Sequence, residues 1–210
     1  MKKHLSLCCC VLVLCLAPMP TQAQTGTDEF KYQHTEIQTI LGQNTKLKNT
    51  PLTLQTFGLY FTLPTLQKHL WLMFIGLRYD NDRLWTAGYF VPMINLIEGA
   101  DGIMGKLEFG LKLFDGKMFA LAATEFYFKF SDKDTNHVLV WYIAGYNLAS
   151  YIQAGLQVMQ VSLLQSSFDT TLKTGPYIAF MKGPLTFRIE TFFNLTQPGF
   201  NMRYSIFVFF

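Results

Sequence analysis

From Pro51 to the end of the chain, apolar and aromatic residues gather in segments of roughly 9 to 14 residues, separated by turn-forming residues. Within most segments, apolar and polar residues alternate, which is the pattern of a β-strand with two unlike faces. The pattern predicts ten strands, at 52–63, 69–79, 84–97, 103–114, 118–130, 138–149, 151–164, 174–182, 184–195 and 201–210. The segments 52–63 and 174–182 have the weakest patterns, so eight strands is the alternative count.

The connections between these segments alternate in length. Tight turns are predicted at 80–83, 115–116, 149–150 and 182–183, and looser connections at 98–102, 131–137 and 165–173. Such alternation is typical of an up-and-down antiparallel barrel that crosses a membrane, with short turns on one side and longer loops on the other. An even number of strands would return both ends of the barrel to the side of the short turns.

Two turns also predict strand register. Asp115-Gly116 is a strong hairpin signal, and it places Lys106 opposite Glu125 on one face of the sheet. On the other face, Leu107, Phe109, Leu111 and Leu113 lie opposite Thr124, Ala122, Ala120 and Met118. Lys182-Gly183 similarly places Leu185 opposite Phe180 and Arg188 opposite Tyr177.

Two strands contain features that disturb a regular ladder. Pro92 lies inside the segment 84–97 and has no N–H to donate, so a bulge or break is expected there. In the segment 151–164, the polar residues change parity near Met159, which suggests a second β-bulge.

The first 50 residues have a different texture. Lys2 and Lys3, the apolar run from Leu5 to Leu16 and the small residue Ala23 have the order of a secretory signal peptide, predicted at 1–23 and cleaved after Ala23. A membrane anchor is disfavoured because the apolar run is shorter than the roughly 18 to 20 residues of a spanning helix. Residues 24–50 are polar and are predicted to be a periplasmic N-terminal arm, and residues 51–210 the barrel.

Composition narrows the class of protein. All four cysteines lie within the predicted signal peptide, so the mature chain would hold neither disulfides nor thiolate metal sites. Of 17 basic and 14 acidic residues, Lys2 and Lys3 would be removed with the signal peptide, and the near-neutral remainder gives no reason to expect a nucleic-acid partner.

The charged fraction is 15%, below the roughly 25% of ordinary soluble domains, and 16% of the residues are aromatic. Beyond residue 24 no apolar run reaches the length of a spanning helix. An exported chain of this kind can occupy a bilayer only as a closed β-barrel, so the predicted fold is an all-β, closed antiparallel transmembrane barrel.

The polar faces of the strands carry few charges, too few for a well-solvated exterior. A narrow lumen in which opposite charges pair suits them better. The residues predicted to line this lumen are Lys106, Glu108, Lys112, Glu125, Lys129, Arg188, Glu190 and Arg203.

The last strand alternates up to the final residue. Tyr204, Ile206, Val208 and Phe210 share one face, and Arg203 faces the other way. This resembles the terminal strand of bacterial outer-membrane β-barrel proteins. The resemblance covers the signal peptide, the last ten residues and the strand texture between them, and in length the chain resembles the small OmpW or OmpX type. It implies that the four outward residues form an assembly signal, that the barrel assembly machinery and outer-membrane lipid are partners, and that the last strand closes against the first.

Candidate chemistry is sparse. Asp132, Asp134 and His137 could form a carboxylate–histidine pair at the outer rim. The segment 131–136 consists of turn-forming residues, however, which favours a solvated loop. His34 and His69 have no evident partners, and no metal-ligand spacing or cofactor motif is present. The sequence therefore favours a non-enzymatic protein without a cofactor.

Three hypotheses about function follow from the sequence. The first is a narrow channel or conduit for small solutes, including apolar ones that leave sideways into lipid. The second is a structural or surface-interaction barrel with a plugged lumen. An outer-rim hydrolase is the least favoured, and the oligomeric state stays open.

Overall fold

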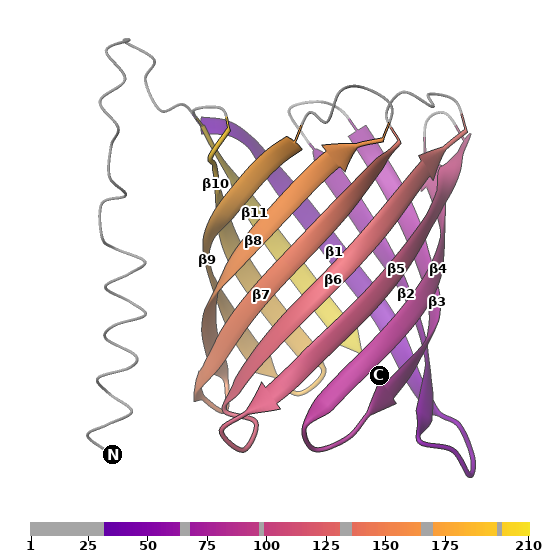
Figure 1. The fold of residues 1–210 in the computed structure, drawn as a ribbon, viewed down its shortest axis with the longest axis vertical. Helices are drawn as coiled ribbons and strands as arrows, with labels where there is room; N and C mark the ends of the chain where they lie inside the picture. The colour runs from indigo at the N-terminus through magenta and orange to yellow at the C-terminus, as the bar shows by residue number, and fades with distance from the viewer. Residues whose placement is uncertain (1–31, 64–67, 97–98, 131–135, 165–169, 197–198) are drawn as a thin grey trace.

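The computed structural model describes residues 32–63, 68–96, 99–130, 136–164, 170–196 and 199–210 (Figure 1). Its strands are β1 Tyr32–Lys46, β2 Leu52–Leu63, β3 Lys68–Asp80, β4 Leu84–Asn95, β5 Gly99–Leu113, β6 Met118–Lys129, β7 His137–Ala149, β8 Ile152–Leu163, β9 Thr170–Lys182, β10 Leu185–Asn194 and β11 Phe200–Phe209. They close into one barrel in which each strand pairs with its sequence neighbours and β1 pairs with β11. Within these ranges, no helix is long and apolar enough to cross a membrane.

The barrel has eleven strands, so the predicted counts of ten and eight are both wrong. All ten expected strands are present, and the additional one, β1, lies inside the range 24–50 that was assigned to a polar arm. The strand alternates around the barrel wall: Glu36 is buried, whereas Ile37 and Leu41 are exposed on the outside. Most other residues of β1 are polar on both faces, so the alternation of apolar and polar residues is weak in this strand.

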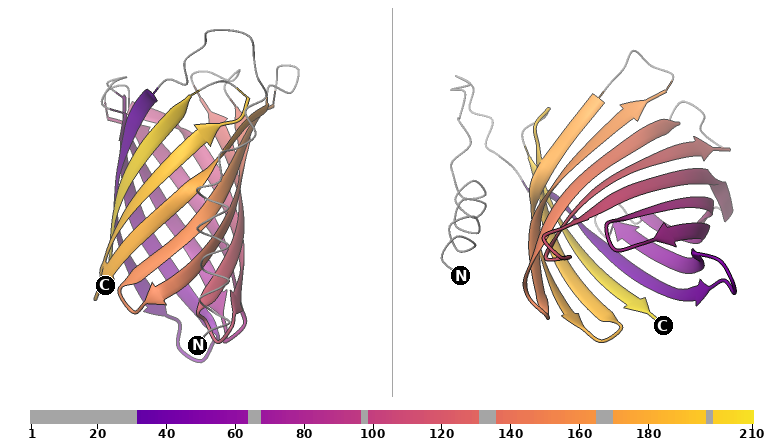
Figure 2. Two further views of the ribbon diagram at one scale, coloured as in Figure 1. Left: turned by 90° about the vertical axis from the view of Figure 1, so that its left-hand side faces the viewer. Right: turned by 60° about the horizontal axis from the view of Figure 1, so that its bottom comes forward.

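The eleventh strand also changes how the barrel closes. Every neighbouring pair is antiparallel except β1 and β11, which run in the same direction and pair Ile37 with Tyr204 and Gly42 with Phe209. The backbone N–H of Phe210 donates to the oxygen of Gly42 at 3.0 Å. The last strand therefore closes the barrel, but it does so in parallel and against β1, not against the segment 52–63 that the sequence predicted as the first strand. The N-terminal end of β1 and the C-terminal end of β11 consequently lie at opposite ends of the barrel (Figure 2), not at the same end.

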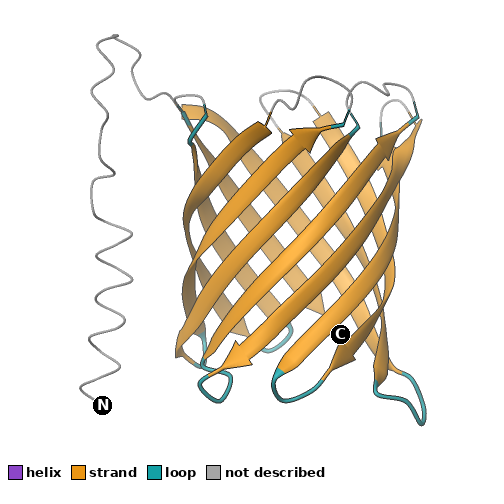
Figure 3. Cartoon of the chain, in the orientation of Figure 1, coloured by secondary structure: helices purple, strands orange, loops and turns teal. Residues whose placement is uncertain are grey.

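Five connections lie at one end of the barrel, here named the tight-turn end. They comprise residues 47–51, 81–83, 114–117, 150–151 and 183–184 (teal, bottom of Figure 3). The opposite end is here named the loop end. The four predicted tight turns therefore lie at one end, but the connection between β4 and β5, predicted as loose at 98–102, spans only 96–98 because β5 begins at Gly99.

Register agrees with expectation in one hairpin and departs from it in the other. In β5–β6 the pairs Lys106–Glu125 and Phe109–Ala122 form as predicted. In β9–β10, Leu185 pairs with Lys182 instead of Phe180, a shift of two residues. The cause is the turn, which uses Gly183-Pro184 in place of Lys182-Gly183. A shift of two keeps every side chain on its predicted face.

The interruption predicted at Pro92 is found on one side of the strand, because the β3–β4 ladder has no pairs at Val91 and Pro92, whereas the bulge predicted near Met159 is absent. β4 runs through Pro92, which pairs with Ile103, and the register shifts one step later, between Met93 and Ile94. β8 pairs regularly on both sides of Met159.

Candidate functional site in the barrel interior

The outer face of the barrel is apolar. Large hydrophobic side chains stand exposed on nine of the eleven strands. Representatives, one from each of these strands, are Ile37, Trp71, Phe90, Leu107, Phe126, Tyr142, Ile178, Leu185 and Ile206. Three of the four residues predicted as the assembly signal, Tyr204, Ile206 and Val208, lie on this outer face because Arg203 and Ser205 are buried inside, and Phe210, the fourth, is 79% exposed at the end.

The interior holds a cavity of about 430 Å³. Much of its wall is apolar: Leu59 and Leu70 line it from β2 and β3, and Leu121 and Leu139 from β6 and β7. Charged side chains meet in the same space. Six of the eight residues predicted to line the lumen border this cavity, namely Lys106, Glu125, Lys129, Arg188, Glu190 and Arg203.

One interior ion-pair cluster spans the β5–β6 hairpin. The ammonium of Lys106 lies 3.0 Å from Glu108 and 3.1 Å from Glu125, so the one lysine bridges two carboxylates. The hydroxyl of Tyr127 donates a second bond to Glu125 at 2.6 Å. The hairpin places Lys106 and Glu125 directly opposite each other, which accounts for this contact.

A second pair joins the closing strands. The guanidinium of Arg203 on β11 contacts Glu36 on β1 at 2.5 Å through both Nε and Nη2. The central carbon of this guanidinium lies 5.1 Å from the ring centre of Trp141 and 4.7 Å from that of Phe192. Both charged side chains are more than nine-tenths buried. This pair is therefore enclosed by aromatic side chains.

A third cluster lies on β10. Arg188 contacts Glu190 at 2.7 Å and donates to the amide oxygen of Gln157 at 2.9 Å. The guanidinium is centred 4.0 Å from the ring of Tyr177. Glu190 also accepts a bond from the hydroxyl of Ser205 at 3.2 Å, which connects this cluster to β11.

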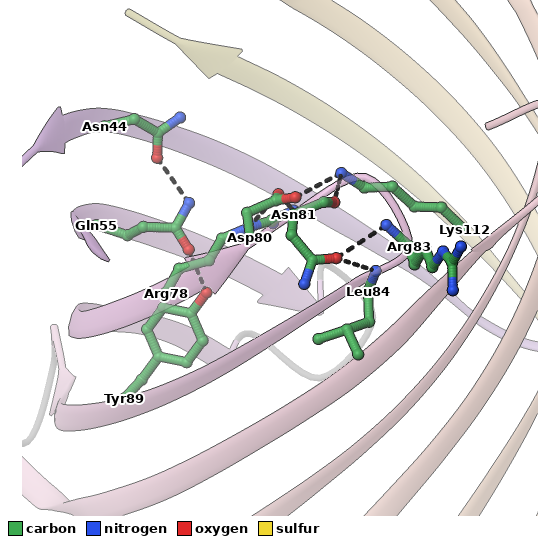
Figure 4. Close-up of polar contacts among 9 residues, drawn as sticks. All are labelled: Asn44, Gln55, Arg78, Asp80, Asn81, Arg83, Leu84, Tyr89 and Lys112. Atoms are coloured by element: carbon green, nitrogen blue, oxygen red, sulfur yellow. Dashed lines mark hydrogen bonds and ion pairs between the residues drawn. The ribbon is translucent and has the colours of Figure 1, made fainter. Parts of the chain in front are cut away.

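Lys112 lies apart from the cavity, at the tight-turn end. It contacts Asp80 and donates to the backbone oxygen of Asn81 at 2.8 Å, while Arg78 contacts Asp80 at 2.5 Å (Figure 4). Lys112 thus ties the β3–β4 turn to β5. Beside it, a neutral chain of hydrogen bonds runs from Tyr89 to Gln55, at 2.5 Å, and from Gln55 to Asn44, at 2.7 Å.

The sequence missed Glu36 and the apolar wall of the cavity. Glu36 was overlooked because it falls in the range assigned to an arm, although its parity with Gln38 and Ile40 marks the inner face of a strand. The apolar wall was overlooked because β3 is apolar on both faces: Leu72 points inward and Met73 outward.

The candidate histidines His137 and His69 each contact a tyrosine. His137 lines the cavity and stacks on Tyr127, with ring centroids 4.3 Å apart. Asp132 and Asp134 lie outside the described residues, as does the side chain of His34. His69 Nδ1 lies 2.8 Å from the hydroxyl of Tyr60. The described part of the chain holds no group of three or more potential metal ligands.

No protein-family model, curated protein or solved structure matches this chain.

Proposed function

We propose that this chain is a bacterial outer-membrane β-barrel protein whose lumen is a narrow conduit for small solutes. The observation that carries the proposal is the apolar outer face of the closed barrel. Folded soluble proteins rarely expose contiguous apolar surface on this scale, whereas a barrel in a bilayer requires it. The proposal includes export by the signal peptide at 1–23 and insertion by the barrel assembly machinery, for which the outward residues of β11 and Phe210 would be the signal.

The proposed solutes are small and partly apolar. A barrel of this strand number leaves little interior space once side chains fill it, so a wide aqueous pore is not expected. The cavity of about 430 Å³ is large enough for a small organic molecule. Its leucine-lined walls favour molecules with apolar groups, and its paired charges leave few free groups to replace the hydration shell of an ion.

A plugged barrel is the second candidate. It is favoured by the three ion-pair clusters, which are centred on Lys106, Arg188 and Arg203 and reach into the same cavity from different strands. If these pairs stay closed, the lumen does not conduct, and the protein has a structural or surface-interaction role.

Conductance in a planar bilayer separates the two candidates. For a conduit we expect discrete openings whose size changes when Lys106→Gln removes the cation between Glu108 and Glu125. Lys106→Arg serves as the matched control because it keeps a cation between the two carboxylates. Altered migration of the unboiled protein on a gel verifies that each variant is folded. Silence from a folded wild-type barrel would reject the conduit and favour the plug.

A further inference from the structure

Among the described side chains, exposed basic residues gather at the tight-turn end of the barrel. Every exposed lysine and arginine among the residues whose side chains are described lies in or beside a tight turn. These residues, here named the basic rim, are Lys46, Lys48, Arg83, Lys117 and Lys182. Toward the loop end, the described lysines Lys129 and Lys173 are partly buried.

The charge of the basic rim is not neutralised locally. Exposed carboxylates near it are Asp80, Asp82 and Asp115. Asp80 is already held by Arg78 and Lys112, two further cations of the same end (Figure 4). Across the described ranges, none of the five rim residues has an ion-pair partner. The tight-turn end therefore carries seven basic residues against three acidic ones.

The basic rim borders the apolar outer face. Leu113 and Phe114, 37% and 59% exposed, end that face just before Lys117. Leu185, 45% exposed, pairs directly with Lys182 across the last turn. Long basic side chains at such a border can lay their methylene groups along apolar surface while the charged ends reach outward.

The rim residues are spread around the barrel instead of forming a patch on one side. Four of the five tight turns carry at least one of them, and only the turn at 150–151 has none. A docked protein would meet a concentrated patch, whereas a bilayer leaflet surrounds the whole circumference. The distribution therefore favours lipid over a protein partner.

We propose that the basic rim binds the phosphate groups of anionic phospholipids in the leaflet at the tight-turn end. The inference rests on the proposed function, since it requires the barrel to span a bilayer. Basic side chains near an anionic membrane surface gain electrostatic attraction that falls off within a Debye length.

Boundary-lipid spectroscopy tests the proposal. The full barrel is reconstituted into phosphatidylcholine vesicles that contain spin-labelled phosphatidylglycerol or spin-labelled phosphatidylcholine, and the motionally restricted fraction of each is measured. We expect phosphatidylglycerol to associate about fivefold more strongly, which corresponds to one basic contact per bound lipid. The triple variant K48Q/K117Q/K182Q should lower the ratio toward one.

Two further variants sharpen the test. K48R/K117R/K182R keeps the charge and should keep the selectivity, while Asp82→Asn with Asp115→Asn should raise it. Equal association of both lipids with the wild type, or a ratio that the glutamine variant leaves unchanged, would overturn the inference. A barrel that restricts neither lipid does not span the bilayer, which would instead be a failure of the proposed function.

Discussion

The closing seam between β1 and β11 and the hairpin of β5 and β6 each hold an interior ion pair, but their strand register is fixed in different ways. Each places an ion pair between directly opposite residues inside the barrel, Glu36 with Arg203 and Lys106 with Glu125. The hairpin strands are joined by the short turn at 114–117. The seam joins residues that are 167 positions apart, and in parallel.

The difference shows where register comes from. A tight turn fixes the pairing of its two strands, so the Lys106–Glu125 pair adds to a register that already exists. No turn fixes the seam, so its register depends on the backbone bonds and side chains of the two strands themselves. A shift in register between the two strands would separate the buried charges and leave both unpaired, which is energetically costly. Glu36 and Arg203 are therefore expected to specify closure as well as to stabilise it.

The largest effect is expected from Arg203→Met. The change leaves Glu36 buried without its partner, which costs about 3–5 kcal/mol in comparable pairs. Lys106→Met removes the cation from both Glu108 and Glu125, but it should cost less because Lys106 and Glu108 are more exposed than the seam pair, Tyr127 still donates to Glu125, and the hairpin turn is intact. Urea unfolding of the reconstituted barrel, followed by tryptophan fluorescence, measures both. The double variant Glu36→Gln with Arg203→Met should recover part of the loss; an Arg203→Met barrel as stable as the wild type would refute the role of the seam pair.

Removal of Phe210 should have the next largest effect. It deletes two backbone hydrogen bonds of the seam, from Phe210 N–H to Gly42 and from Asn44 N–H to Phe210. At about 1 kcal/mol each, the free energy of unfolding should fall by about 2 kcal/mol in the same urea assay. Phe210→Ala is the control, since it keeps both bonds and removes a ring that is 79% exposed. Equal losses in the two variants would show that the ring, and not the backbone, holds the terminus.

The smallest effect is expected in the hairpin turn. Gly116 has φ of +77°, where a β-branched side chain is strained, so Gly116→Val should cost about 1–2 kcal/mol. Gly105→Ala is the matched control, because a Cβ at Gly105 meets no atom within 4 Å. Its unfolding midpoint should stay close to that of the wild type. A loss at Gly116 as large as the loss at Arg203 would contradict the contrast between hairpin and seam.

Most of the fold could be predicted because alternation and turn chemistry are local signals. The ten strands from Leu52 onward carry both signals, and the register of β5–β6 follows from one turn. The strand β1 was not predicted because its inward residues Glu36 and Gln38 are polar and its outward face is also largely polar. Parallel closure then followed from a strand that the pattern does not reveal.

The interior site was predictable to the same extent. Lys106 and Glu125 could be paired because the turn fixes their register. Glu36 and Arg203 could not, since no local feature connects residues so far apart in sequence. The leucine-lined wall could not be predicted either. Alternation of apolar and polar residues assigns one apolar face to each strand, whereas β3 is apolar on both faces.

The proposed function requires the outer face of the sheet to meet lipid, and two leucines test this directly. Leu107 on β5 is 61% exposed on the outer face, and Leu121 on β6 lines the inner cavity. All four native cysteines precede residue 16, so the barrel has none, and Leu107→Cys or Leu121→Cys can each carry one bimane label. In vesicles with doxyl-labelled lipid, we predict strong quenching at position 107 and little at position 121. Quenching at 121 with none at 107 would contradict the account.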